Sequence, residues 1–370
     1  MFKFAGIIFC ALFFLAGCST TPPQYPLDWP ETNAAVKPAV IQTNKPVILT
    51  VKSNPPPAVV PTPAPAAPVA AWTSLENWAE EHKTGRPHRI SDSPTTTYAI
   101  GSGYGVMVLG IGSLEATWNG VEINFGFAPE FIDGEIFLNE LDLQKNLEPL
   151  LCEPPLTFSK TNRVIVIDPG HGGSNHGTYA HSVQDGPFEK KFTLDWAKRL
   201  KPLLETEGWK VFLTRTNDVY VTNADRVVFA EANHADLFIS LHFNSTEEDK
   251  KTGKRNGKAG GLETYCITPT GMPSTLTRDF GDNWSDILPN NAFDAQNIRL
   301  AVRVHSALLR AVGMEDHGVR RSRFDTVLRG QNRPAILVEG GFLSNPTETK
   351  LIESPDYRQK LAEGVANALK

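Results

Sequence analysis

The sequence contains two histidines and two glutamates whose positions suit metal-assisted hydrolysis. These side chains are His171, Glu189, His242 and Glu339. Both histidines and Glu339 follow apolar, mostly β-branched runs that predict buried strands, whereas Glu189 comes just before a predicted helix. If the strand ends share one edge of a sheet, the four side chains converge, because sites in α/β proteins form at the carboxyl ends of strands.

Such a set has a definite chemical use. A catalytic zinc ion takes three protein ligands, imidazole nitrogens or carboxylate oxygens, together with a water whose pKa falls to about 7. Two histidines and one glutamate supply that number of ligands. A second carboxylate can then move a proton from the attacking water to the leaving nitrogen, which an amide needs because its amine leaves poorly until protonated. Taken singly, each of these residues is also compatible with a structural role.

Other site classes find less support in the sequence. The glycine-rich turn around His171 could cradle a phosphate, but it lacks the Gly-Lys-Ser/Thr ending of a P-loop. Asn175 stands where a dinucleotide-binding fingerprint requires Gly or Ala. The chain contains neither a Gly-x-Ser-x-Gly elbow nor a His-Glu-x-x-His helix. Its mild net charge of -5 argues against nucleic acid as the main partner.

From about residue 160, predicted strands alternate with predicted helices. Strands are expected at 164–167, 210–214, 237–241, 262–267 and 335–339, and helices at 192–204, 223–233, 297–312, 347–352 and 357–369. This alternation predicts an α/β domain with a largely parallel sheet covered by helices on both faces. Asn223 is expected to cap the helix that it begins.

A small mainly-β domain is predicted for residues 72–155. Asn119-Gly120 divides two alternating runs, which indicates a hairpin with a type I′ turn, and Asp133-Gly134 repeats the pattern. Trp118, beside the first turn, fits a core position better than a binding position. The region resembles the stalk-type domain named after the N-terminal part of copper amine oxidases, although nothing in it suggests copper. Both a wall- or partner-binding role and a structural role remain open for it.

The N-terminus indicates export. Lys3 and the apolar stretch Phe4–Phe14 form a secretory signal that is too short to span a membrane as a helix. Leu15-Ala16-Gly17-Cys18 resembles the lipobox of bacterial lipoproteins, which implies a signal peptide at 1–17 and lipidation of Cys18. The alternative is an ordinary secretory signal with an incidental cysteine.

The segment after this signal is expected to be a tether. Residues 18–71 are rich in proline and lack hydrophobic periodicity, so they predict a disordered spacer. Ser19, next to the cysteine, resembles the sorting signal for the outer membrane. The expected location is therefore periplasmic, with a lipid anchor in the outer membrane.

The motifs after residue 160 together resemble one known family. They are Ile167–Gly173, Glu189-Lys190, Thr214-Arg215, Arg226, Ala232-Asn233, Ser240–Asn244 and Val338–Asn345. The domain at 160–370 is similar to the zinc-dependent N-acetylmuramoyl-L-alanine amidases of the amidase-3 type. That resemblance implies a mixed, mostly parallel sheet, zinc bound by His171, Glu189 and His242, and Glu339 as the catalytic carboxylate. The implied reaction is hydrolysis of the peptidoglycan amide between N-acetylmuramic acid and L-Ala.

Two other functions fit the same residues. One is a zinc peptidase that cuts within the stem peptide, and the other is a non-catalytic wall-binding lipoprotein. The implied partners are peptidoglycan and a membrane, and the resemblance leaves open an activator protein. In some relatives an inserted segment blocks the site, and residues 268–297 offer Asp279, Asp282 and Asp286 for such a plug. A surface excursion or a wall of the substrate groove is the better-supported role for this segment.

The remaining polar and sulfur-containing residues leave alternatives open. Arg320, Arg321 and Arg323 either line the substrate groove, where they would meet the acidic stem peptide, or form a solvated turn. His176 and His181 fit solvated loop residues. The four cysteines form neither a disulfide framework nor a CxxC metal pattern. A bridge between Cys152 and Cys266 is one possibility in an oxidising compartment.

Overall fold

The computed structural model describes residues 71–159, 161–180, 187–248, 255–275, 282–323 and 326–370. The predicted signal peptide, Cys18 and the proline-rich tether lie outside these ranges. The described residues form one compact unit. Within the described ranges, no helix combines the length and the apolar character needed to cross a membrane.

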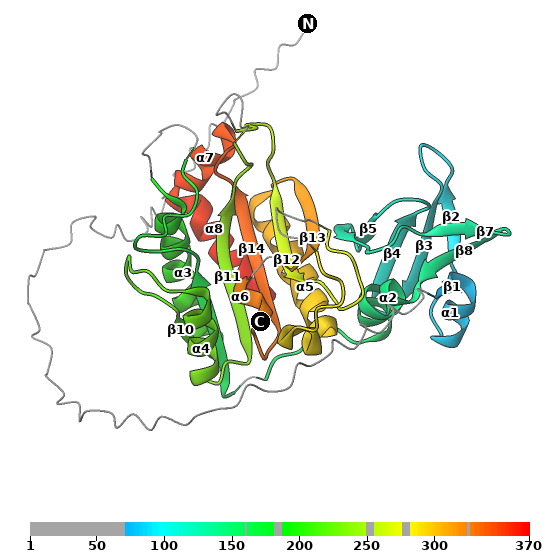
Figure 1. The fold of residues 1–370 in the computed structure, drawn as a ribbon, viewed down its shortest axis with the longest axis horizontal. Coiled ribbons are helices and arrows are strands. Elements are labelled where there is room, and N and C mark those ends of the chain that lie inside the picture. Colours follow the sequence, from blue (N-terminus) through cyan, green and yellow to red (C-terminus); the bar gives the residue numbers. More distant parts are fainter. Residues whose placement is uncertain (1–70, 160, 181–186, 249–254, 276–281, 324–325) are drawn as a thin grey trace, which may run out of the picture. The chain divides into compact units, whose positions relative to one another are not determined.

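An eleven-stranded sheet runs through this unit, in the order β10-β9-β11-β14-β12-β13-β6-β5-β4-β3-β2 (Figure 1). The strands are β2 (His88–Ser91), β3 (Thr97–Ser102), β4 (Gly105–Gly110), β5 (Glu115–Trp118), β6 (Val121–Asn124), β9 (Arg163–Pro169), β10 (Trp209–Leu213), β11 (Leu237–Asn244), β12 (Leu262–Ile267), β13 (Asp316–Ser322) and β14 (Ala335–Phe342). Strands β10, β9, β11 and β14 are parallel, while β12 is antiparallel to β14 and parallel to β13. The prediction of a mixed, mostly parallel sheet is confirmed.

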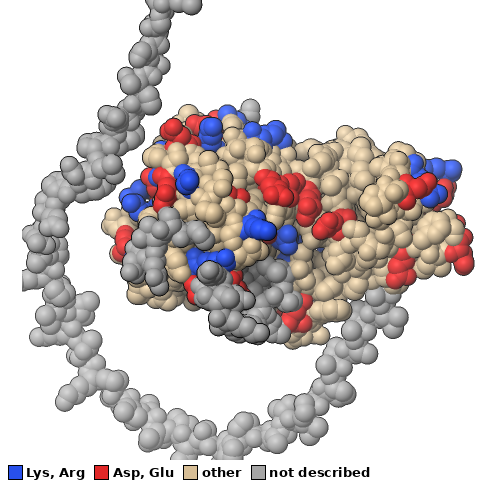
Figure 2. Space-filling model, turned by 90° about the horizontal axis from the view of Figure 1, so that it is seen from above, with Lys and Arg blue, Asp and Glu red and all other residues tan. Residues whose placement is uncertain are grey.

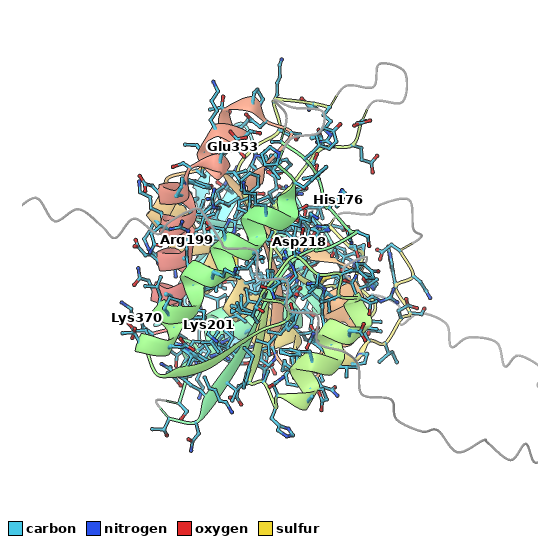
Figure 3. All side chains as sticks on the ribbon, turned by 90° about the vertical axis from the view of Figure 1, so that its left-hand side faces the viewer. His176, Arg199, Lys201, Asp218, Glu353 and Lys370 are labelled. Carbon is cyan, nitrogen blue, oxygen red and sulfur yellow. The ribbon has the colours of Figure 1, made fainter. Side chains whose placement is uncertain are left out.

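Helices cover both faces of the parallel half. Those on one face are α3 (Glu189–Thr206), α5 (Asp294–Val312) and α8 (Pro355–Ala368), and those on the other are α4 (Asn223–Ala232) and α6 (Thr326–Arg329). Helix α7 (Pro346–Glu353) follows β14. Strand β9 shows the alternation, because Ile165 and Ile167 join the α3 core while Val166 joins the α4 core. Figure 3 views the α3 side, where Arg199 and the α8 residue Arg358 both bind Asp195.

The N-terminal part is mainly β, as predicted. Besides β2–β6 it contains β1 (Trp72–Ser74), α1 (Leu75–Glu81), β7 (Glu130–Ile132), β8 (Glu135–Asn139), α2 (Glu140–Asp142) and the π-helical segment η1 (Leu143–Cys152). Asn119 and Gly120 have φ values of 51° and 81°, as the expected type I′ turn requires. Trp118 is buried in the core, which confirms the interpretation from the sequence.

The consecutive antiparallel strands β2–β6 form a meander, and strand β13 joins this meander to the parallel half of the sheet. Val319 of β13 pairs with Ile123 of β6, which makes the sheet continuous. The guanidinium of Arg321 donates to the carbonyl of Lys145 at 2.9 Å and to Asn146 Oδ1 at 3.0 Å. The segment at 268–297 also contributes, because Trp284 packs edge-on against Phe127 with ring centroids 6.1 Å apart.

Three expectations need correction. Thr222, not Asn223, caps α4, since the Thr222 hydroxyl accepts from the amide of Asp225 at 3.1 Å. No disulfide joins Cys152 to Cys266, and Cys266 accepts a hydrogen bond from Arg321. Strand β13 was not expected, because its sequence DHGVRRS is mostly polar. Its polar side chains find partners in neighbouring elements, which a periodicity argument does not include.

Candidate active site

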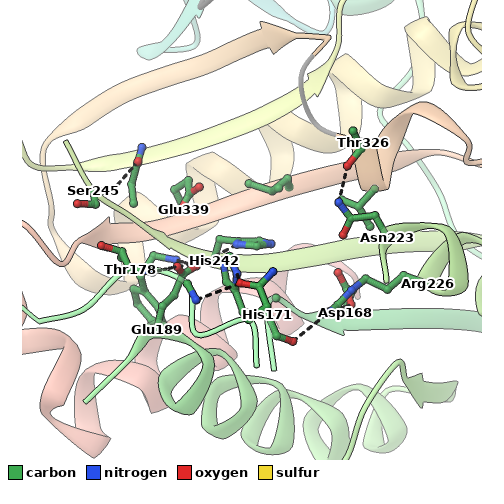
Figure 4. Close-up of a pocket in the computed structure, with 17 residues that line it drawn as sticks. Asp168, His171, Thr178, Glu189, Asn223, Arg226, His242, Ser245, Thr326 and Glu339 are labelled. Atoms are coloured by element: carbon green, nitrogen blue, oxygen red, sulfur yellow. Dashed lines mark hydrogen bonds and ion pairs between the residues drawn. The ribbon is translucent and has the colours of Figure 1, made fainter. Parts of the chain in front are cut away.

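Strand register brings the polar side chains of β9, β11 and β14 to one face. His242 lies opposite Glu339 in the β11–β14 pair, and Asp168 lies opposite Ser240 in the β9–β11 pair. Side chains two residues apart share a face, so all four point toward the side covered by α4 and α6. Figure 4 shows Asp168, His242 and Glu339 among the residues that line one pocket.

His171 lies in the turn after β9 in an unusual backbone conformation. Its φ of 62° is in the left-handed region, which residues other than glycine seldom adopt. Two buried arginines hold the turn by its carbonyls. Arg215 donates to Pro169 O at 2.9 Å and to Gly170 O at 2.8 Å, and Arg226 donates to His171 O at 2.7 Å. Burial, with Arg226 nearby, lowers the pKa of Arg215 to about 10.

Gly170 and Gly177 allow the side chains of His171, Glu189 and His242 to approach one another. A Cβ on Gly170 would lie 2.2 Å from Cε1 of His242. A Cβ on Gly177 would lie 2.4 Å from Oε2 of Glu189, and Gly177 has a φ of 68°. The glycines therefore serve close packing around the histidines, which a phosphate cradle would not require.

Glu189 is the first residue of α3 and is buried. Its Oε2 lies 3.0 Å from His171 Nε2, and its Oε1 lies 2.9 Å from His242 Nδ1. The same two oxygens accept from the backbone amides of Thr178 and Phe243. Burial alone would raise the pKa of Glu189, but the two histidines hold it well below its usual range. Burial alone would lower the pKa of His171, but Glu189 raises it above its usual value.

In each imidazole, the nitrogen that does not face Glu189, called here the outer nitrogen, has a defined acceptor. His171 Nδ1 lies 2.9 Å from Asn175 Oδ1, which also accepts from the amide of Gly177 and is therefore the amide oxygen. His242 Nε2 lies 3.1 Å from the hydroxyl of Ser240, whose proton goes to Asp168 at 2.7 Å. Each outer nitrogen can thus donate to a protein acceptor, which would leave the lone pair of the inner nitrogen, the one that faces Glu189, available for a metal ion.

This arrangement fits a divalent metal ion. Ligand atoms of His171, Glu189 and His242 lie within 4.8 Å of one another. Two lone pairs and a carboxylate that face one point repel each other unless a cation lies between them. Fixing the outer nitrogen with a protein acceptor is also how metal-binding histidines are oriented. The three residues could therefore hold a metal ion.

Glu339 lies beside these three residues in one cavity. The cavity has a volume of about 350 Å³ and is also lined by residues of α4 and α6, namely Asn223, Arg226, Thr326 and Val327. Glu339 is buried, and Glu263 of β12 lies opposite it in the β12–β14 pair. All four side chains singled out in the sequence thus meet in this cavity.

The other candidates that the structure describes do not line this cavity. Arg321 and Arg323 are buried, and Arg323 binds Asp282 at 2.6 Å. These two arginines therefore neither line this cavity nor form a solvated turn. Asp282 is thereby engaged away from the site, and Asp286 binds Arg329. His176 packs against Phe188 with ring centroids 4.4 Å apart. Asp279 and His181 lie outside the described residues.

The structure adds residues to which the sequence gave no role. Asp168 accepts from Ser240, Thr214 and Arg226, and this buried network fixes both the turn and His242. Asn175 fixes the other histidine. A charged residue at the end of an apolar strand is the signal that marks Asp168, but its partners come from three other elements. Only their convergence shows what Asp168 does.

The charged surface is mixed in sign. Figure 2 shows acidic and basic side chains interspersed over the described part of one face. A basic patch suited to nucleic acid is therefore not what this face offers, which agrees with the mild net charge.

Two histidines and a glutamate at the strand ends of a mixed sheet, with a second glutamate at the start of a helix, form an arrangement suited to metal-dependent hydrolysis. A family model described as N-acetylmuramoyl-L-alanine amidase (Amidase_3) matches residues 165–370. The chain belongs to this family.

Relatives of this name match more than half of the chain. The sporulation-specific N-acetylmuramoyl-L-alanine amidase of Bacillus subtilis is 32% identical over 207 residues, which cover 55% of this chain and 66% of the relative. AmiA of Salmonella typhimurium is 27% identical over 238 residues, 59% of this chain and 78% of that protein. Among solved structures, an N-acetylmuramoyl-L-alanine amidase from Clostridium difficile 630 is 30% identical, with a TM-score of 0.45 over 57% of this chain and 95% of its own.

Proposed function

We propose that this protein is an N-acetylmuramoyl-L-alanine amidase that uses zinc and cleaves the peptidoglycan amide between N-acetylmuramic acid and L-Ala. The observation that carries the proposal is the meeting of His171, Glu189 and His242 within 4.8 Å, in a cavity that Glu339 also lines. Membership of the amidase family supports the choice of substrate.

The donor set favours zinc over harder cations. Calcium and magnesium prefer oxygen ligands, whereas two imidazoles and one carboxylate are ligands that zinc takes in catalytic sites. Bound there, zinc would polarise the scissile carbonyl and lower the pKa of a water molecule to about 7.

Glu339 is proposed to move the proton. Its strand places it across from His242, so its carboxylate faces the same cavity as the proposed ligands. It would accept a proton from the attacking water and deliver it to the nitrogen of L-Ala, which then leaves as a neutral amine. Asp168, Ser240 and Asn175 would keep both imidazoles in the tautomer that this chemistry needs.

A digest of purified sacculi tests the reaction. We expect release of intact stem peptides with a free L-Ala amine, detected by mass spectrometry, and loss of that release when a chelator is added. Fragments cut within the stem peptide would instead identify a peptidase. Binding to sacculi without any release would identify a wall-binding protein.

Glu339→Gln tests the proton carrier. We expect turnover to fall by about 10²–10⁴-fold, the usual contribution of general acid–base catalysis, while bound zinc is retained. Glu315→Gln is the matched control, because Glu315 is exposed and lines neither described cavity. Near-normal turnover of Glu339→Gln would show that another group carries the proton.

The cellular location is proposed from the N-terminal sequence. Leu15-Ala16-Gly17-Cys18 supports a lipid anchor at Cys18, in the outer membrane, with the catalytic part in the periplasm. Labelling with a radioactive fatty acid should mark the wild type and leave Cys18→Ala unmarked. An unlabelled wild type would remove the anchor.

A further inference from the structure

A second cavity, of about 310 Å³, lies between α5, the β5–β6 hairpin and the chain that follows η1. Its apolar lining residues are Trp118, Val121, Pro149, Leu150, Pro155, Leu156 and Val302. Its volume falls within the roughly 300–1,000 Å³ of ligand pockets. It shares no lining residue with the cavity around His171.

Three arginines on one face of α5 give this cavity a positive lining. Arg299, Arg303 and Arg310 are four and seven residues apart, a spacing that keeps them on the same side of a helix. Glu153 is the one acidic residue among the described residues of the lining, and it forms an ion pair with Arg299. The lining therefore carries three guanidinium groups and a single carboxylate.

The other two arginines form no ion pair with an aspartate or glutamate among the described residues. Arg303 donates to the backbone oxygens of Leu156 and Lys370, and Arg310 donates to the hydroxyl of Ser306. Burial lowers the pKa of Arg303, because the surroundings solvate its charge poorly. An anion in the cavity would compensate that charge.

The hairpin side supplies aromatic and amide groups. Tyr104, in the β3–β4 turn, is 43% exposed, and Asn119 lies in the β5–β6 turn. A ligand in this cavity would therefore meet apolar surface, an aromatic ring, an amide and guanidinium groups. That combination suits a short peptide with small apolar side chains and free carboxylates.

We propose that this cavity binds the stem peptide of a peptidoglycan strand, with its carboxylates on Arg303 and Arg310. The proposal rests on the proposed function, because peptidoglycan is the wall polymer that such an enzyme would meet. Stem peptides combine alanine methyl groups with free carboxylates, which match the apolar and the cationic lining. The cavity would hold the protein on the wall while the site around His171 acts on another stem peptide.

Charge distinguishes this ligand from the chain's own proline-rich segment. Its most proline-dense part, residues 55–68, contains no acidic side chain and so offers no anion to the arginines. A phosphate polymer would supply anions but no apolar groups for the apolar part of the lining. The phosphate polymer remains an outcome of the test.

Co-sedimentation with sacculi tests the proposal, using the full chain with Glu339→Gln so that the wall stays intact. Adding Arg310→Glu should weaken binding about tenfold, the size expected from losing one charge-assisted hydrogen bond. Arg310→Lys should retain most of the affinity, which separates charge from folding. Lys360→Glu, on the exposed side of α8, is the matched control and should bind as Glu339→Gln alone.

Several results would overturn the proposal. One is unchanged binding of Arg310→Glu, and another is an equal loss in Lys360→Glu. A third is an equal effect of Arg310→Glu on binding to peptide-free glycan chains or to a soluble polyphosphate, since the ligand would then not be the peptide. The digest of sacculi tests the proposed function separately. If the wild type releases no stem peptide but its binding still depends on Arg310, the amidase proposal is wrong and the proposal of a peptide-binding cavity stands.

Discussion

Both halves of the eleven-stranded sheet contain residues in the left-handed conformation, but they are held in different ways. In the meander, Asn119 and Gly120 adopt it inside a two-residue turn, where local backbone twist favours it. In the parallel half, His171 adopts it in a turn whose carbonyls are held by the buried Arg215 and Arg226. The first conformation is local, whereas the second depends on side chains from distant parts of the chain.

The comparison shows where buried polar groups serve to position other residues. Asp168, Arg226 and Ser240 are buried beneath the proposed ligands and satisfy one another. Burying these groups costs free energy, and their role is to position the turn of His171 and the ring of His242. Substitutions in the parallel half should therefore change both stability and the site, and those in the meander should change stability alone.

The largest effect is expected for Asp168→Asn. The change leaves the buried charge of Arg226 without its carboxylate partner, which should lower the free energy of unfolding by about 3–5 kcal/mol. Urea denaturation measures this loss. Asp236→Asn, at the opposite end of the same strands and exposed, is the control and should cost about 1 kcal/mol or less. Equal losses would mean that burial of the pair is irrelevant.

Asp142 tests whether the N-terminal part contains its own costly buried charge. Burial raises the pKa of Asp142 from 3.8 to about 6, although it accepts hydrogen bonds from Gly126, Phe127 and Asn146. The folded state thus binds this proton more tightly than the unfolded chain does. Its contribution to stability is fully present below the unfolded pKa of 3.8 and is lost as the pH rises through about 6.

The matched variant for this prediction is Asp142→Asn, which cannot titrate. The difference in unfolding free energy between wild type and variant should fall by up to about 3 kcal/mol from about pH 4 to pH 7. This is the free energy that corresponds to the difference between the folded and unfolded pKa values. Denaturation at several pH values measures it. A difference that stays constant with pH would show that Asp142 is solvated.

Ser240→Ala should affect the proposed metal site more than the fold. The hydroxyl links His242 to Asp168, so its loss frees the ring to turn and should lower zinc affinity about 10–100-fold. Competition with a chromophoric chelator measures the affinity without any turnover. Ser306→Ala, at a serine outside the catalytic cavity, provides the comparison. Unaltered zinc affinity in Ser240→Ala would remove Ser240 from the set of positioning residues.

The smallest effect is expected for Gly120→Ala in the meander. A Cβ at a φ of 81° costs about 1–2 kcal/mol, and nothing within 4 Å of the added atom increases the cost. Thermal or urea denaturation should detect the loss, with zinc affinity equal to that of the wild type. A change in zinc affinity would show that the two halves are coupled more closely than their separate hydrogen-bond networks indicate.

Much of the fold could be predicted because its signals are local. The Asn-Gly and Asp-Gly turns, the apolar run at 164–167 and the helix around residues 297–312 depend on neighbours in sequence, and the structure contains each of them. Strand β13 could not be predicted in this way. Arg321 and Asp316 find partners in η1 and β6, which lie far away in the chain, and Asp316 also pairs with His305 of the preceding helix α5.

The sequence by itself determined which side chains could do the chemistry. His171, Glu189, His242 and Glu339 stand at strand and helix ends that periodicity alone locates, and the motif resemblance gives them roles. Only the tertiary structure decided how they are held. The register of β9, β11 and β14 aligns Asp168, Ser240 and Glu339 on one face, and Arg226 arrives from α4. Hydrogen bonds between distant segments set these positions, and such pairings leave no periodic trace in a single sequence.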